Sequence, residues 1–242
     1  MTGKLYVVGV GPGDPDLMTI KAARILRQVS CICVPRGREE GSSLALSIIE
    51  GVVDLSGKDI VEAYFPMKKT RSDAADDELP ERWNETAANI LKRLEKGIDV
   101  AFITIGDPTI YSTFFYLYDR LMDLKPDIFI DIIPGVSSIT AAAARSGISL
   151  GLADEKIAII PAAYAGDLGR VLSEFDTVVL MKVNRVFDTV SRYLTEAGLA
   201  ESAVYISKAG MREEAVIRGL GAVRKEDLSY FSLIIARRQA RG

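Results

Sequence analysis

The sequence predicts an α/β protein with parallel strands buried on both faces, and three observations support this fold class. Short apolar runs alternate along the 242 residues with segments whose apolar residues recur at helical spacing. Several runs are apolar at successive positions, which is typical of strands inside a parallel sheet. Many of them end in turns rich in glycine or proline. Because open α/β sheets bind ligands beyond the carboxyl ends of their strands, these turns are the candidate sites.

In the first half of the chain, we expect strands separated by helices at residues 5–8, 29–34, 60–63 and 100–105. The first helix is expected to begin at a cap formed by Asp14 and Pro15. Its spacing predicts a buried stripe made of Leu17, Ile20, Ala23 and Leu26.

The second half repeats the alternation, with strands expected at residues 128–133, 157–160, 177–181, 204–206, 215–219 and 230–236. The last two flank a turn-rich segment, which suggests an antiparallel hairpin. Two α/β halves that meet near residues 114–118 fit this pattern. We therefore expect an N-terminal domain over residues 1–113 and a C-terminal domain over residues 118–242.

The composition is that of a soluble globular protein, with 48% hydrophobic and 26% charged residues. The net charge of −3 gives no general reason to expect nucleic acid as a partner. No segment reaches the roughly 18–20 apolar residues of a membrane helix, and the first apolar run is too short for a signal peptide. We therefore expect a cytoplasmic protein without a membrane partner.

Histidine is absent, which excludes Ser-His-Asp hydrolysis and histidine-built metal catalysis. The two cysteines, Cys31 and Cys33, lie two residues apart on an expected strand and lack the spacing of a Cys-x-x-Cys motif. They are expected to be buried core thiols, and no metal site is expected.

The turn Gly106-Asp107-Pro108 ends the central expected strand and has two interpretations. It could hold a ligand at the carboxyl end of the sheet, because glycine permits close approach and aspartate supplies an acceptor. It could also be an ordinary strand-to-helix turn, with Asp107 as the N-cap and Pro108 at the first helical position. Ser137 or Ser138 could likewise be only the N-cap of an alanine-rich helix.

The loop at residues 9–14, Gly-Val-Gly-Pro-Gly-Asp, is more specific than a plain turn requires. It is not a dinucleotide fingerprint, because the spacing differs from Gly-x-Gly-x-x-Gly and Pro12 removes a backbone amide.

Two other loops carry cations. The loop containing Arg36 and Arg38 could bind an anion or be an ordinary solvated loop. The long connection over residues 65–77 combines apolar residues with cations and is expected to be a lid.

Four segments, in this order and spacing, closely resemble the tetrapyrrole (precorrin) methylases: GVGPGDPDLMTIKAARIL, IGDPTIYST, PGVSSITAAAA and VVLMKV. The resemblance covers essentially the whole chain. The segments YFPM, GDPTIYST, LMKVNR and YFSLIIARR are similar to the branch that methylates carbon 20 of precorrin-2 or cobalt-factor II in cobalamin biosynthesis.

The resemblance implies two α/β domains of the tetrapyrrole methylase type, with the active site in the interdomain cleft, and usually a homodimer. It implies S-adenosylmethionine as the methyl donor and S-adenosylhomocysteine as its product. Carried over by position, donor contacts fall on Pro12, Ile105, Gly106, Asp107, Ile110, Ser137, Ser138, Met181, Ala209 and Gly210. Tetrapyrrole contacts fall on Gly11, Pro12, Gly13 and Asp14.

Methyl transfer to a meso carbon requires orientation and the removal of a proton. Without histidine, the base must be a carboxylate, a tyrosine, a lysine or water. Asp107 and Tyr111 lie closest to the donor motif, and we expect them to position the reactants first and to accept a proton second. Arg36, Lys68 and Arg71 lie on loops that could supply cations to the substrate carboxylates.

Other functions stay open at this point. A methylase of the same fold could act at another tetrapyrrole position or on another acceptor, as siroheme-type enzymes or diphthine synthase do. The siroheme branch has a glycine where this chain has Ile105, which favours a different methylation position. A nucleotide-binding regulatory module on an α/β scaffold is a further alternative. Metal-free and cobalt-chelated substrates both fit, and we favour the cobalt form because nothing in the chain requires a metal to be excluded.

Overall fold

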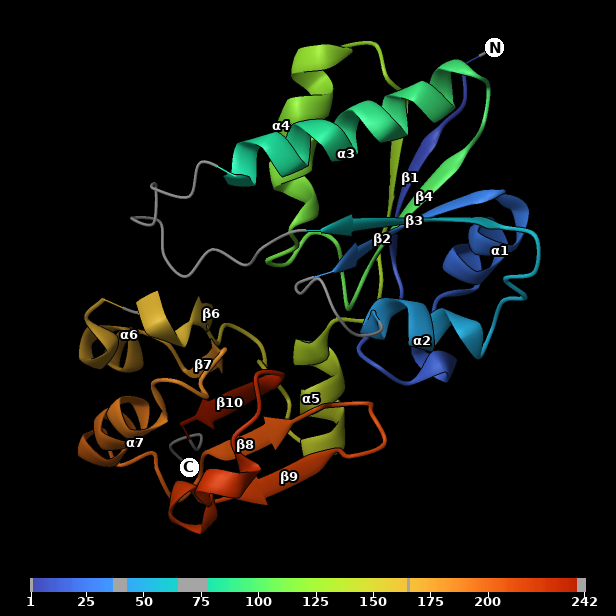
Figure 1. Cartoon of the computed structure of the whole chain (residues 1–242). Coiled ribbons are helices and arrows are strands. Elements are labelled where there is room, and N and C mark those ends of the chain that lie inside the picture. Colours follow the sequence, from blue (N-terminus) through green and yellow to red (C-terminus); the bar gives the residue numbers. More distant parts are fainter. Residues whose placement is uncertain (1, 37–42, 65–77, 165, 239–242) are drawn as a thin grey trace. The chain divides into compact units, whose positions relative to one another are not determined.

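The computed structural model describes residues 2–36, 43–64, 78–164 and 166–238, which belong to two compact units (Figure 1). The first unit comprises residues 1–137 and the second comprises residues 138–242. Each unit has its own five-stranded sheet with helices between the strands. The expected fold class, α/β with two domains, is therefore confirmed.

The first unit is built on a parallel sheet with the strand order β3-β2-β4-β1-β5. Its strands are β1 (Leu5–Gly9), β2 (Cys31–Arg36), β3 (Asp59–Tyr64), β4 (Val100–Thr104) and β5 (Ile130–Ile133). All neighbouring pairs run parallel. The carboxyl ends of the five strands therefore lie at one edge of the sheet.

Helices cover both faces of this sheet (Figure 1). They are α1 (Ile20–Gln28) and α2 (Leu44–Glu50) on one face, and α3 (Glu78–Glu95) and α4 (Phe114–Leu124) on the other. Successive strand residues point to opposite faces. Val7 and Phe102 belong to the core cluster of α3 and α4, whereas Val8 and Ile103 belong to that of α1 and α2. The strands are apolar at successive positions because both faces are covered.

The boundary between the units differs from the one expected between residues 113 and 118. Strand β5 pairs with β1 from Leu5 with Ile130 to Val8 with Ile133, so it completes the first sheet. Helix α4 packs its buried residues Phe114, Leu117 and Leu121 in a core cluster of the same unit. Residues 114–137 therefore belong to the first unit, and the boundary follows Ser137.

The second unit contains a mixed sheet with the strand order β6-β7-β10-β8-β9. Its strands are β6 (Ile157–Pro161), β7 (Thr177–Met181), β8 (Val204–Ser207), β9 (Ala215–Arg218) and β10 (Ser232–Arg237). Strand β6 runs parallel to β7, whereas β10 runs antiparallel to both β7 and β8. Strands β7 and β8 thus point the same way, and their carboxyl ends share an edge.

The expected hairpin of residues 215–219 and 230–236 is wrong, because β8 lies between these two strands. Ile206 of β8 pairs with Val216 on one side and with Leu233 on the other. Every residue of β8 is buried, whereas half-buried and exposed residues alternate along β9. The fully buried strand therefore occupies the interior of the sheet, and β9 forms its edge.

The helices of the second unit are α5 (Ser138–Ser146), α6 (Leu168–Glu174) and α7 (Phe187–Glu196), with short 3-10 turns at Ala162–Tyr164, Leu220–Ala222 and Lys225–Asp227. Leu172 and Leu194 of α6 and α7 pack with Tyr205 in one core cluster. The Tyr205 hydroxyl donates to the carbonyl of Asp227 at 2.8 Å and accepts from the amide of Ser229 at 3.1 Å. This buried hydroxyl fixes the turn that leads into β10.

The first helix begins later than the sequence predicted. Asp14 caps the 3-10 turn Pro15–Leu17, and the side chain of Thr19 caps α1 by accepting from the amide of Ala22 at 3.2 Å. This second start changes the helical phase. Ala23 and Leu26 are buried as expected, but Ile20 is 88% exposed.

No helix within the described residues is long and apolar enough to cross a membrane.

Candidate functional site

Three glycines bring the ends of adjacent strands into direct backbone contact in the first unit. They are Gly9 at the end of β1, Gly106 after β4 and Gly135 after β5. A Cβ atom on Gly135 would lie 2.2 Å from the carbonyl oxygen of Gly106 and 3.0 Å from Cα of Gly9. A Cβ on Gly9 would lie 2.6 Å from the same carbonyl oxygen. These glycines are needed for backbone packing, because no side chain fits between the loops.

The loop that contains Gly11, Pro12 and Gly13 joins this arrangement through the backbone. The amide of Gly106 donates to the carbonyl of Gly11 at 2.7 Å, and the two glycines form an isolated antiparallel bridge. Both have positive φ angles, +83° for Gly11 and +73° for Gly106, which glycine adopts without strain. Pro12 is buried, whereas Gly13 and Asp14 are half-buried. The loop is therefore held in place by the turn that follows β4.

Asp107 ties two loops together with both oxygens of its carboxylate. Its Oδ1 accepts from the amide of Thr109 at 2.8 Å and also from the Thr109 hydroxyl. Its Oδ2 accepts from the amide of Gly135 at 3.0 Å. Helix α4 begins only at Phe114, so Asp107 is not its N-cap. The corner after β4 is thus a cross-linked turn rather than an ordinary start of a helix.

The residues on either side of Asp107 differ in their exposure to solvent. Ile105 and Ile110 are half-buried, and Tyr111 is 46% exposed with a φ of +51°. A positive φ is costly for a bulky residue and is often found at functional sites. Partial removal from water raises the pKa of Tyr111 above its usual value. The phenol therefore stays protonated near neutral pH.

A second group of candidate residues lies where β7 and β8 end in the second unit. Met181 is the last residue of β7, and Ala209 and Gly210 follow β8 closely. Lys182 and Lys208 each directly follow a strand and have φ angles of +57° and +51°. Their amides donate to the carbonyls of Ser232 and Phe231 at 3.1 and 2.7 Å. The start of β10 therefore fixes both turns.

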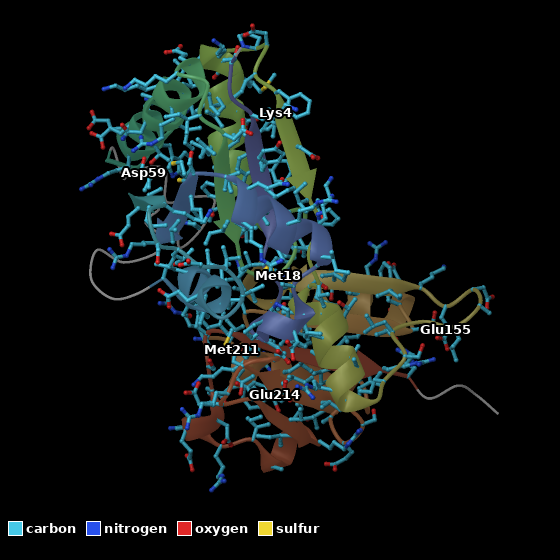
Figure 2. All side chains as sticks on the ribbon, turned by 90° about the vertical axis from the view of Figure 1, so that its right-hand side faces the viewer. Lys4, Met18, Asp59, Glu155, Met211 and Glu214 are labelled. Carbon is cyan, nitrogen blue, oxygen red and sulfur yellow. The ribbon has the colours of Figure 1, made fainter. Side chains whose placement is uncertain are left out.

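The loop after β8 is also anchored by Glu214, which Figure 2 labels. The carboxylate of Glu214 accepts from the amide of Gly210 at 2.7 Å and lies 3.3 Å from Nε of Arg145 in α5. Gly210 has a φ of +75°, which favours glycine. Ser138 is the first residue of α5, and the preceding Ser137 is buried.

Sequence reasoning missed Lys182, although it directly follows the strand residues of the motif VVLMKV. The residue is exposed to solvent, yet partial desolvation by the surrounding protein lowers the pKa of its ammonium. The ammonium of Lys208 lies 3.3 Å from a carboxylate oxygen of Glu213. The lowered pKa of Lys182 could not be predicted from the sequence, because it depends on which groups surround the side chain in the folded protein.

The predicted cationic residues have different outcomes. Arg36 is the last residue of β2, and its guanidinium pairs with the carboxylate of Glu62 on β3. Lys68 and Arg71 lie outside the described residues, as do Arg38 and the expected lid over residues 65–77.

The two cysteines are buried, as the sequence predicted. Burial raises the pKa of Cys31 to about 11, and the neighbouring carboxylate of Asp59 adds to the effect. Burial also raises the pKa of Cys33. Both groups are therefore protonated and unreactive thiols near neutral pH. Within the described residues, no group of histidine, cysteine and carboxylate side chains is arranged to hold a metal ion.

The glycine-rich strand ends of the first unit and the two lysine turns of the second lie within one stretch of the chain that matches a known family. Residues 4–222 match the family model of Tetrapyrrole (Corrin/Porphyrin) Methylases, and the chain belongs to this family. The resemblance drawn from the sequence motifs is therefore confirmed.

Two similar curated proteins carry the name of the same methyltransferase. The chain is 38% identical to the cobalt-precorrin-2 C(20)-methyltransferase of Salmonella typhimurium, over 99% of this chain and 98% of that protein. It is 40% identical to a probable cobalt-precorrin-2 C(20)-methyltransferase of Methanocaldococcus jannaschii, over 78% of this chain and 76% of that protein.

Solved structures show the same fold. A cobalamin biosynthetic enzyme, cobalt precorrin-4 methyltransferase, matches with a TM-score of 0.74 and 23% identity, over 97% of this chain and 94% of that one. The uroporphyrin-III C-methyl transferase of Thermus thermophilus, complexed with S-adenosyl homocysteine, matches with a TM-score of 0.66 and 21% identity, over 97% and 92% of the two chains.

Proposed function

We propose that this protein transfers the methyl group of S-adenosylmethionine to carbon 20 of precorrin-2 or cobalt-precorrin-2 in cobalamin biosynthesis. The observation that carries the proposal is the match, along nearly the whole of both chains, to the cobalt-precorrin-2 C(20)-methyltransferase of Salmonella typhimurium. We propose the cobalt-chelated substrate, in agreement with the names of both relatives described above. We further propose a homodimer, as the family resemblance implies, and a cytoplasmic location.

The residues of the first unit fit a methyl donor that has apolar and polar parts. Half-buried Ile105 and Ile110 offer apolar surface beside the polar corner at Asp107. When bound, the donor supplies a methyl group already activated by its sulfonium. The chain must therefore supply mainly orientation, which can contribute about 7–11 kcal/mol. We assign donor contacts to this corner, to Pro12, and to Ser137, Ser138, Met181, Ala209 and Gly210.

Asp107 is best suited to positioning. Each of its carboxylate oxygens already accepts a hydrogen bond from the protein. The bond to Gly135 joins the loop after β5 to the loop after β4, and the bond to Thr109 fixes the turn after β4. We therefore propose that Asp107 and Tyr111 position the reactants first and accept a proton only second, and the raised pKa of Tyr111 favours its protonated form. We add Lys182 as a candidate proton acceptor, because it directly follows Met181 at the end of β7 and desolvation lowers the pKa of its ammonium.

Tetrapyrrole carboxylates require cations at the edge of the site. We assign Arg36, Lys68 and Arg71 to this role, with Gly11, Pro12, Gly13 and Asp14 lining the tetrapyrrole side. Arginine binds carboxylates through two parallel hydrogen bonds, whereas lysine acts as a point charge.

The proposed product can be identified directly. The purified protein is supplied with donor carrying a labelled methyl group and with either precorrin-2 or its cobalt chelate, and the label is located by carbon NMR. We expect the label on carbon 20, with faster turnover of the cobalt form. A label on a pyrrole carbon, or no turnover of either substrate, would contradict the proposed function. Turnover of the metal-free form alone would contradict only the cobalt preference.

Replacing Asp107 with alanine is expected to weaken S-adenosylhomocysteine binding at least tenfold. The variant leaves the exposed amide of Thr109 and the part-buried amide of Gly135 without their shared carboxylate, and a hydrogen bond to a charged group contributes about 1.5–3 kcal/mol. Titration calorimetry on the folded variant measures the affinity. Thr109→Val is the matched control, because it removes only the hydroxyl donor and should change the affinity less. Unchanged affinity in Asp107→Ala would show that the corner does not position the donor.

A further inference from the structure

We infer that Glu62 is a competing carboxylate that occupies Arg36 and thereby sets the affinity for the carboxylates of the substrate. The inference rests on the proposed function, because it requires a substrate rich in carboxylates. Glu62 itself contacts neither substrate nor donor in this proposal, but it determines how strongly Arg36 binds a substrate carboxylate.

The contact between Arg36 and Glu62 lies close to the carboxyl ends of the strands of the first sheet. Arg36 ends β2, and Glu62 lies two residues before the end of β3. In the parallel register, Glu62 pairs with Val34 and Tyr64 pairs with Arg36. Residues two apart on a strand share a face, so Arg36 and Glu62 project from the same face of the sheet. Nη1 of Arg36 contacts Oε2 of Glu62 there.

The two side chains differ in their exposure to solvent. The Arg36 side chain is 19% exposed, whereas that of Glu62 is 51% exposed. The arginine is therefore held by the protein, and its carboxylate partner is the group that can move into water. A guanidinium carries five N–H donors in a planar fork and binds one incoming carboxylate well. An incoming carboxylate can replace Glu62 without leaving either charge buried and unpaired.

A purely structural explanation of the pair is that it stabilises edge strand β3. Cross-strand pairs of opposite charge contribute roughly 0.2–1 kcal/mol, and exposed pairs contribute little. The same strand offers a comparison at its other end. Asp59, labelled in Figure 2, is 55% exposed in its side chain and accepts from Nε of Arg93 at 2.8 Å. That pair lies at the amino ends of the strands, away from the glycine-rich turns at their carboxyl ends. We therefore expect it only to stabilise the fold.

The test compares Glu62→Gln with Asp59→Asn in the full chain. Glu62→Gln removes the competing charge while keeping the side-chain length. We expect it to lower the KM for cobalt-precorrin-2 about two- to fivefold, the range expected for the loss of one exposed ion pair. The kcat and the affinity for S-adenosylhomocysteine should stay unchanged. Asp59→Asn should leave all three quantities unchanged.

A double variant shows whether Glu62 acts through Arg36. Arg36→Gln should raise the KM. In that background, Glu62→Gln should no longer lower the KM, because the arginine through which it acts is absent. A thermal shift with S-adenosylhomocysteine verifies that each variant folds and binds donor.

Two outcomes would overturn the inference while leaving the proposed function intact. One is an unchanged or raised KM in Glu62→Gln with an active wild-type enzyme. The other is an equal decrease in KM when Glu62→Gln is introduced into the Arg36→Gln background. An inactive wild-type protein with every tetrapyrrole supplied would overturn both the inference and the proposed function, so the two failures are distinguishable.

Discussion

Replacing Gly135 with alanine is expected to lower the free energy of unfolding by about 3 kcal/mol, the upper end of the usual cost of overpacking. The new Cβ would lie 2.2 Å from the carbonyl oxygen of Gly106, and the next atoms, Cα and C of Gly9, would lie at 3.0 Å. All of these atoms belong to the backbone, so no flexible side chain can move away to relieve the clash. Denaturant unfolding followed by circular dichroism measures the loss.

The same substitution should weaken S-adenosylhomocysteine binding at least tenfold, because it separates the loop after β5 from Asp107. Gly221→Ala is the matched control, since a Cβ at position 221 would have no atom within 4 Å and the φ of Gly221 is not in the left-handed range. We expect Gly221→Ala to change stability by no more than about 0.5 kcal/mol. Similar stability for both variants would show that the three strand ends are not tightly packed.

The fold could be predicted where a local pattern determines the structure. Strands such as β1 and β4 are apolar at successive positions, and this property follows directly from a sheet covered on both faces. The strand order could not be predicted in the same way. The insertion of β8 between β9 and β10 depends on pairing between distant segments, and a turn-rich connection is equally compatible with a hairpin. Likewise, the position of β5 beside β1 follows from long-range pairing.

The candidate site shows the same division between local and long-range information. The glycines at positions 106 and 11 could be singled out because they interrupt apolar strands with unusual turns. The partners of Asp107 could not all be predicted, because Gly135 lies 28 residues away in the chain. The contact of Arg36 with Glu62 also joins separate strands. Sequence therefore identified the loops, and the parallel sheet determined which groups meet.

Replacing Lys182 with methionine is expected to reduce kcat by at least about 100-fold, the lower limit for loss of a general base. The variant should not lose stability near pH 7. The folded protein lowers the pKa of Lys182 below its ordinary value of 10.5, so the unfolded chain binds this proton more tightly. The ammonium therefore disfavours the folded state at neutral pH, and this penalty decreases as the pH rises toward 10.5.

Three measurements distinguish a proton acceptor from a structural lysine. The wild-type kcat should rise with pH and level off below pH 10.5, because only the neutral amine accepts a proton. Lys182→Arg should be as inactive as Lys182→Met, since arginine keeps the charge but stays protonated. Lys208→Met is the matched control, because Lys208 shares the positive φ and also directly follows a strand of the same sheet. Activity retained in Lys182→Met, or lost equally in Lys208→Met, would assign the proton to another group.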